Sequence, residues 1–147
     1  MTEKNAFHLR PARPDELDWV NSRYAEIGFQ PSSANDFVVI AETAEGRAGL
    51  GRLVRIDETQ GELGGIYVFP EFRGKHLAQA IVAYLIEQSP HARLFCIPFA
   101  HLSGFYQGFG FVHPAASDEV PAAILRKVDW CRCSYPEAVD LLLRTSN

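Results

Sequence analysis

Residues 62–85 constrain the fold most, because the spacing of their apolar side chains changes once, across a short polar turn. Leu63 and residues 66–69 are apolar, β-branched or aromatic, and Pro70 follows them directly. Such a short run is typical of a buried strand. From Leu77 onward the apolar residues recur three to four positions apart, as on one face of a helix. The segment therefore predicts a strand, a turn and a helix.

The turn itself carries Arg73, Gly74 and Lys75 directly before the helix. The first turn of a helix has unpaired N–H groups and a partial positive charge, and glycine lets a ligand approach the backbone. We expect a phosphate or pyrophosphate site here, the alternative being an ordinary turn with solvated cations. A Walker loop is excluded because His76 follows Gly74-Lys75, and a dinucleotide fingerprint is excluded because it needs three spaced glycines.

The length of 147 residues predicts a single domain covering residues 1–147, and 47% hydrophobic residues suit a globular core. A net charge of -4 argues against general nucleic-acid or membrane binding. Three cysteines and no apolar leader segment favour a reducing cytoplasm. Cys131-x-Cys133 lacks a second Cys or His pair at zinc spacing, so no metal site is expected.

The rest of the chain predicts a mixed α/β sheet. Asp15 is expected to cap the first helix, with Asp18 as its capping-box partner and Gly28 at its end. The strand after the 77–85 helix should lie parallel to the central strand, and such neighbours can separate at their C-terminal ends to admit a ligand. The expected strands are 7–13, 37–42, 48–56, 62–69, 94–98 and 124–133, and the expected helices are 15–27, 77–88, a short one within 100–111, and 135–143.

Residues 66–78 resemble the pyrophosphate-binding segment of the GNAT N-acetyltransferases, whose pattern is Arg/Gln-x-x-Gly-x-Gly/Ala. Arg73 and Ala78 match its ends, and Gly74 matches the glycine usual after the Arg. His76 departs from the pattern, standing where the family usually has glycine; it either crowds the pyrophosphate or donates a hydrogen bond to it. The resemblance implies acetyl-CoA as cosubstrate, bound by Ile66, Tyr67, Val68, Arg73, Gly74, Lys75, His76, Leu77 and Ala78.

The same resemblance implies a GNAT fold, an α/β (α+β) architecture. It has a mixed central sheet of six to seven strands, flanked by about four helices, with two strands splayed at the acetyl-CoA site. The loop of residues 29–36 would help form the acceptor pocket.

Two further residues resemble catalytic groups of the family. Phe105-Tyr106 followed by Gly110-Phe111 matches a later motif, which makes Tyr106 the general acid for the leaving thiolate. Glu62, at the start of the central strand, is the candidate base. The alternatives are a packing tyrosine and a solvated strand-end charge. In the family, backbone N–H groups near residues 66–68 stabilise the negative charge on the thioester oxygen.

The expected activity is acetyl transfer from acetyl-CoA to a primary amine of a small molecule or protein, through a tetrahedral intermediate. Its expected partner is the amine acceptor, and the last strand could pair in a homodimer. One alternative is a non-catalytic CoA-binding module that regulates a partner protein. Another is an interaction domain without cofactor, against which the intact residues 73–75 argue.

Overall fold

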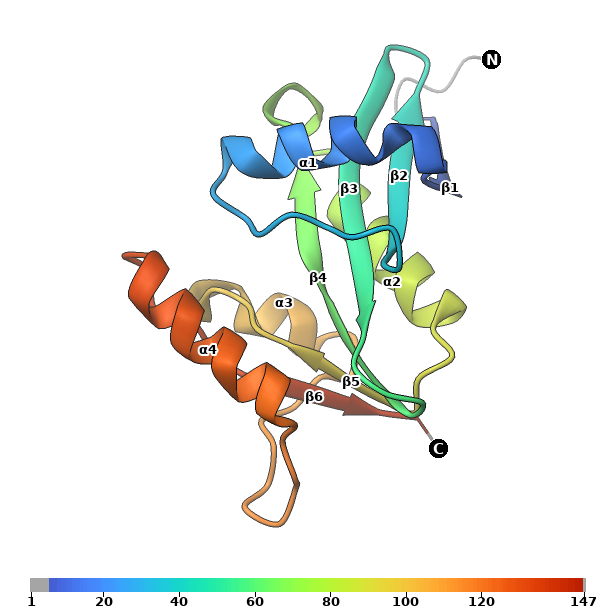
Figure 1. The fold of residues 1–147 in the computed structure, drawn as a ribbon. Helices are drawn as coiled ribbons and strands as arrows, with labels where there is room; N and C mark the ends of the chain where they lie inside the picture. The colour runs from blue at the N-terminus through green and yellow to red at the C-terminus, as the bar shows by residue number, and fades with distance from the viewer. Residues whose placement is uncertain (1–5, 147) are drawn as a thin grey trace. The chain divides into compact units, whose positions relative to one another are not determined.

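The computed structural model describes residues 6–146, which form strands and four α-helices (Figure 1). No helix in this range is long and apolar enough to span a bilayer. In chain order the elements are β1 Phe7–Pro11, α1 Leu17–Glu26, β2 Phe37–Thr43, β3 Gly46–Arg55, β4 Gln60–Val68, α2 Leu77–Gln88, β5 Arg93–Cys96, α3 Ser103–Gln107, α4 Ala122–Ser134 and β6 Leu142–Thr145.

The strands form one mixed six-stranded sheet in the order β1-β2-β3-β4-β5-β6. β4 and β5 are parallel, whereas β1 with β2, β2 with β3, and β5 with β6 are antiparallel. This sheet and its helices confirm the predicted fold class. The chain divides into two compact units: unit 1 runs to Val54 and includes Gly65–Ser89, and unit 2 comprises Arg55–Gly64 and the chain from Pro90. β4 therefore begins in unit 2 and ends in unit 1.

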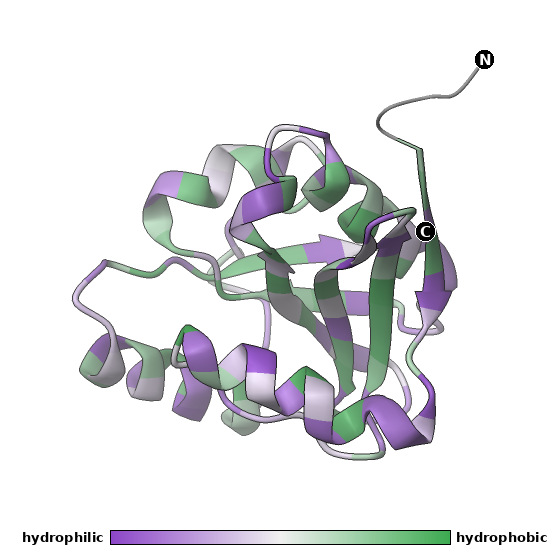
Figure 2. Cartoon of the chain, turned by 90° about the horizontal axis from the view of Figure 1, so that it is seen from above, coloured by the Kyte–Doolittle hydropathy of each residue, from purple (hydrophilic) through white to green (hydrophobic). Residues whose placement is uncertain are grey.

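In unit 1, α1 and α2 cover opposite faces of the strands (Figure 1). Successive strand residues point to opposite faces, so neighbours on β3 meet different helices. Gly51 leaves room for the side chains of Ile81 and Leu85 of α2, whereas Arg52 lies over the ring of Tyr24 of α1. The strands carry long hydrophobic stretches, whereas hydrophobic and hydrophilic residues alternate along the helices (Figure 2). Helices α1 and α2 thus each bury apolar side chains against one face of the strands.

Unit 2 is organised around β5. Its residues pair with β4 on one side, Glu62 opposite Phe95, and with β6 on the other, where Leu143 lies opposite Phe95. Phe95, Leu143, Ile124 and Val128 form a buried cluster. The parallel pairing between β4 and β5 covers residues 60–62 only, within the described chain.

The C-terminal prediction was wrong: residues 124–133 belong to helix α4 and not to a strand. The buried residues Ile124, Val128 and Cys131 lie four and three positions apart, which is a helical period that their β-branched and aromatic neighbours obscured. Trp130 of the same helix is half-buried. The helix predicted over 135–143 is also wrong, because residues 135–141 form no helix and lead into β6 at Leu142. Adjacent Leu142 and Leu143 are both buried, which fits a strand covered on two faces.

The start of α1 also differs from expectation, since Asp15 and Asp18 form no capping box. A 3-10 turn of Pro14–Glu16 precedes the helix, and the buried Glu16 carboxylate accepts a hydrogen bond from the Arg13 N–H at 2.9 Å. Gly28 follows the helix with φ of 73°, as the predicted C-terminal glycine requires.

Candidate functional site

The N-terminus of α2 presents a row of free backbone donors. The first bond of the helix runs from the Ala80 N–H to the His76 carbonyl at 3.2 Å, and the Arg73 N–H donates to Pro70. Within the described chain, no hydrogen bond occupies the N–H groups of residues 74–79. Free N–H groups at the positive end of a 12-residue helix suit an anion.

The turn before α2 has an unusual backbone. Gly74 and His76 both have positive φ, 83° and 61°, and His76 is the one non-glycine residue with positive φ in the described chain. Glycine adopts such a conformation without strain, whereas a Cβ there costs about 1–2 kcal/mol. The imidazole is exposed, and its Nδ1 lies 3.2 Å from Gln79 Nε2.

Both cations of the turn remain in reach of an anion. Arg73 is exposed, and its Nε donates a long 3.4 Å hydrogen bond to the Val68 carbonyl. The Lys75 ammonium lies 5.6 Å from the centre of the Phe72 ring. Neither cation forms an ion pair with a carboxylate of the described residues. Positive charge on the turn is therefore not neutralised within unit 1.

Gly65 has a left-handed backbone within β4, just before the predicted acetyl-binding residues. Its φ is 62°, and a Cβ there would lie 2.6 Å from Tyr24 Oη, which donates to the Gly65 carbonyl at 2.7 Å. A glycine in the left-handed conformation is typical of a β-bulge, where side chains no longer alternate strictly between the two faces of the strand. Tyr67 beyond it is buried, and its hydroxyl lies 3.2 Å from Glu26 Oε1.

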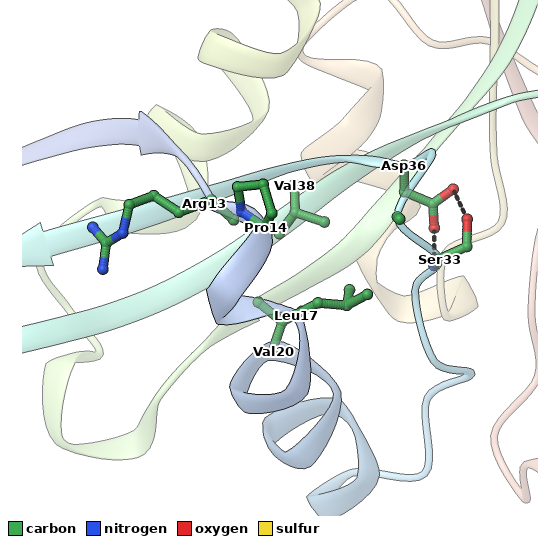
Figure 3. Close-up of a pocket in the computed structure, with 9 residues that line it drawn as sticks. Arg13, Pro14, Leu17, Val20, Ser33, Asp36 and Val38 are labelled. Carbon is green, nitrogen blue, oxygen red and sulfur yellow. Dashed lines mark hydrogen bonds between the residues drawn. The ribbon is translucent and has the colours of Figure 1, made fainter.

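A cavity of about 190 Å³ opens beside the predicted acceptor loop (Figure 3). Asp36 holds one wall, accepting hydrogen bonds from the N–H and hydroxyl of Ser33 at 3.1 and 3.5 Å. The Arg13 side chain points away from the other labelled residues (Figure 3). The lining residues are Ala12, Arg13, Pro14, Leu17, Val20, Ser33, Ala34, Asp36 and Val38. The cavity is thus mainly apolar with a polar rim.

Glu62 is buried and paired in unit 2. Lys127 Nζ of α4 donates to Glu62 Oε2 at 2.6 Å, and the two side chains are 23% and 8% exposed. The solvated strand-end alternative for Glu62 is therefore wrong. Lys127 was missed because its segment was assigned to a strand; the helical spacing of Ile124 and Val128 was the signal that could have placed it on a helix.

Tyr106 lies at 6% exposure on α3, packed edge-on against Phe105 and Phe111. Burial, and secondarily the charge of Cys96, raises the pKa of the Tyr106 hydroxyl well above its usual value. The hydroxyl thus keeps its proton at neutral pH. Burial likewise raises the pKa of the Cys96 thiol, and the charge of Glu62 raises it further.

The predicted residues fall in two groups: the cofactor residues from Ile66 to Ala78 lie in unit 1, and Glu62 and Tyr106 lie in unit 2. In residues 6–146, no three metal-binding side chains gather. Cys131 is buried and Cys133 exposed. His113 Nε2 lies 2.7 Å from Asp140 Oδ2, which Ser103 also contacts.

Comparison with protein families gives a match to the acetyltransferase (GNAT) domain over residues 34–113, which is more than half of the chain. The match includes the turn before α2 and the Tyr106 segment. Comparison with curated proteins gives no match.

Solved structures similar to the chain share its fold at low identity. One is N-acetylglutamate synthase from Neisseria gonorrhoeae complexed with coenzyme A and L-arginine, with TM-score 0.70, 16% identity and 95% of this chain covered. This chain spans 33% of that chain's length. A Mycobacterium tuberculosis protein in complex with CoA has TM-score 0.74 at 15% identity, with 95% of this chain and 99% of that chain covered. A GNAT family acetyltransferase from Elizabethkingia anophelis with acetyl-CoA bound has TM-score 0.65 at 14% identity, with 98% and 100% covered.

Proposed function

Because the chain belongs to the GNAT acetyltransferase family, we propose that it transfers the acetyl group of acetyl-CoA to a primary amine. The amine nitrogen attacks the thioester carbonyl, a C–N bond forms, and the C–S bond of the tetrahedral intermediate breaks. The amine loses a proton and the CoA thiolate gains one. The acceptor is an amine of a small molecule or a protein.

The observation that carries the proposal is the anion site at the start of α2. Free N–H groups at residues 74–79, with Arg73 and Lys75 beside them, form a cradle that fits the pyrophosphate of CoA. The residues proposed to line it are those named from the sequence, Arg73, Gly74, Lys75, His76, Leu77 and Ala78. The exposed His76 imidazole adds a donor at the rim of the same turn.

The backbone of Ile66, Tyr67 and Val68 is assigned to the acetyl group and pantetheine arm. A peptide segment that follows a left-handed glycine can direct N–H groups at a ligand instead of at a neighbouring strand. Such donors stabilise the negative charge that develops on the thioester oxygen.

Tyr106 and Glu62 are assigned to proton transfer. The Tyr106 hydroxyl is protonated at neutral pH and is the proposed proton donor to the thiolate as the C–S bond breaks. Burial raises its pKa and so makes it a weaker acid than a solvent-exposed tyrosine. Glu62 accepts the amine proton directly or through water, and Lys127 holds its carboxylate in place at 2.6 Å.

The first experiment is a calorimetric titration of the protein with acetyl-CoA. Wild type should bind at micromolar concentration, and Arg73→Ala should bind about 10–150-fold more weakly, because a charge-assisted phosphate contact contributes about 1.5–3 kcal/mol. Arg126→Ala, which removes an exposed arginine of α4, is the control and should bind like wild type. No binding at millimolar acetyl-CoA would sink the cofactor assignment.

The second candidate is a GNAT-fold module that binds CoA and regulates a partner without turnover. The strained His76 position and the tight pairing of Glu62 with Lys127 favour it. Release of the CoA thiol in the presence of an amine panel separates the two. Tyr106→Phe should lower kcat more than it raises KM if Tyr106 is the acid, and equal rates would remove it from that role.

The cellular setting belongs to the same proposal. Three unpaired cysteines, one of them exposed, suit a reducing compartment such as the cytoplasm. Pairing of two copies remains a proposal to be tested by light scattering.

A further inference from the structure

Arg52 on β3 is a buried cation without a counter-charge. Its side chain is 4% exposed, yet no carboxylate of the described residues forms an ion pair with it. Nη1 donates to Ser32 Oγ at 2.7 Å, and the buried Nε has no hydrogen-bond partner within residues 6–146. Arginine is rarely buried unless paired, because removing the charge from water costs several kcal/mol.

The surroundings of Arg52 hold it in place, but within residues 6–146 they put no carboxylate at ion-pair distance. The guanidinium carbon lies 4.3 Å from the centre of the Tyr24 ring. Ser32 is itself fixed by Asn21, whose Oδ1 accepts from the Ser32 N–H at 2.7 Å and whose Nδ2 donates to its carbonyl at 3.0 Å. These contacts preset the position of a cation that the folded chain leaves unneutralised.

Arg52 lies next to the backbone assigned to the acetyl group. A Cβ on Gly65 would come within 2.9 Å of Arg52 Nε, and Gly65 directly precedes Ile66. Ser32 directly precedes Ser33, which lines the cavity of about 190 Å³ together with Ala34. All of these residues belong to unit 1. The buried Arg52 guanidinium, the backbone assigned to the acetyl group and the mainly apolar cavity therefore all belong to unit 1.

We infer that Arg52 binds a carboxylate of the acceptor, so that the acceptor is an amino acid or a similar amine bearing a carboxylate. The inference rests on the proposed acetyl transfer and names its substrate class. A planar guanidinium matches the two oxygens of a carboxylate, and the incoming negative charge neutralises the buried cation. The apolar cavity takes the side chain of the acceptor.

A purely structural Arg52 would behave differently. If its hydroxyl and ring contacts mainly stabilised the fold, Arg52→Met would lower the unfolding temperature. An unpaired buried charge destabilises the free protein, so Arg52→Met should melt at the wild-type temperature or above it.

The test uses acetyl-CoA with matched acceptors: free L-amino acids, their α-amides, and the decarboxylated amines. Wild type should prefer the carboxylate member of a productive set by at least about 30-fold in kcat/KM, which corresponds to about 2 kcal/mol. Arg52→Met should lose this preference through KM for the acceptor, with KM for acetyl-CoA unchanged. Arg52→Lys, which keeps the charge, should retain part of the preference, and Arg55→Met, an exposed arginine at the end of the same strand, should behave like wild type.

A second measurement does not need turnover. In thermal unfolding without acetyl-CoA, an amino acid of the preferred set should raise the melting temperature of wild type and Arg55→Met but not of Arg52→Met. Equal use of amides and amines, a preference that survives in Arg52→Met, or a large loss of stability in that variant overturns the inference. Failure of the proposed function looks different, because then acetyl-CoA itself does not bind; if it binds and only carboxylate-free amines react, the function stands and the inference falls.

Discussion

His76 combines an L-residue with a left-handed backbone at the first turn of α2. His76→Gly should raise the free energy of unfolding by about 1 kcal/mol, because glycine adopts positive φ without the Cβ clash. Chemical denaturation measures the change. Lys75→Gly, next to it and without positive φ, is the matched control and should lower stability.

The same variant decides the role of the imidazole. Tighter acetyl-CoA binding by His76→Gly would identify His76 as an obstruction, and weaker binding would identify it as a ligand. An unchanged dissociation constant would remove His76 from the cofactor site.

Glu16 provides a pH-dependent contribution to stability. Both oxygens accept from Arg10 at 2.8 and 2.9 Å, and Arg47 lies at 3.2 Å. The Arg10 hydrogen bonds lower the pKa of Glu16 from 4.5 to about 2, against an opposing effect of burial. Because the folded pKa is depressed, this contribution is complete above about pH 4.5 and is lost as the pH falls through 2.

Glu16→Gln should therefore cost roughly 2–3 kcal/mol at pH 7, and the difference from wild type should shrink between pH 4.5 and 2. Urea denaturation at several pH values measures it. Asp15→Asn, an exposed neighbour, should show little effect at any pH. A pH-independent difference would contradict the assignment.

At the scale of elements, β4 depends on Gly65. Gly65→Ala should destabilise the protein by about 2–4 kcal/mol, because the left-handed backbone and the contacts with Tyr24 Oη and Arg52 Nε both oppose a Cβ. Gly64→Ala is the matched control: its Cβ would meet only Glu62 Oε2, at 3.4 Å. If both alanine variants melt alike, the left-handed conformation of Gly65 does not require glycine.

Local patterns predicted most elements but not those of the C-terminal third. The strand, turn and helix around Arg73 follow from Pro70 and from the change in spacing of the apolar residues. Both are properties of residues close together in the chain. Ile124 and Trp130 favoured a strand by residue type, although the buried positions follow a helical period. Pairing of β6 with β5 depends on partners about 50 residues apart in the chain, such as Cys96 opposite Leu142.

Candidate site residues divide in the same way. Glycine and cations before a helix have a local signature, so the turn of residues 73–76 and the start of α2 at Leu77 were predictable, and their role in cofactor binding stays a prediction. The lack of a counter-charge at Arg52 and the partner of Glu62 arise from contacts with Ser32 and Lys127, 20 and 65 positions away. Patterns among residues close together in the chain cannot predict such long-range contacts.

For the whole molecule, β4 links the unfolding of the two units. Its residues belong to unit 2 as far as Gly64 and to unit 1 from Gly65. Scanning calorimetry should therefore show one transition, with calorimetric and van't Hoff enthalpies equal. Gly65→Ala in unit 1 and Lys127→Met in unit 2 should both shift this transition downward, whereas two resolved transitions would contradict coupled unfolding.

The uneven exposure of the cysteines has a practical consequence. Cys133 is exposed, whereas Cys96 and Cys131 are buried and burial raises the pKa of both thiols. A thiol reagent should modify Cys133 within the mixing time of the experiment. It should reach Cys96 and Cys131 only when unit 2 unfolds transiently. The rate of the slow labelling phase thus measures how often unit 2 unfolds transiently. Mass spectrometry can follow it in the native sequence, without any substitution.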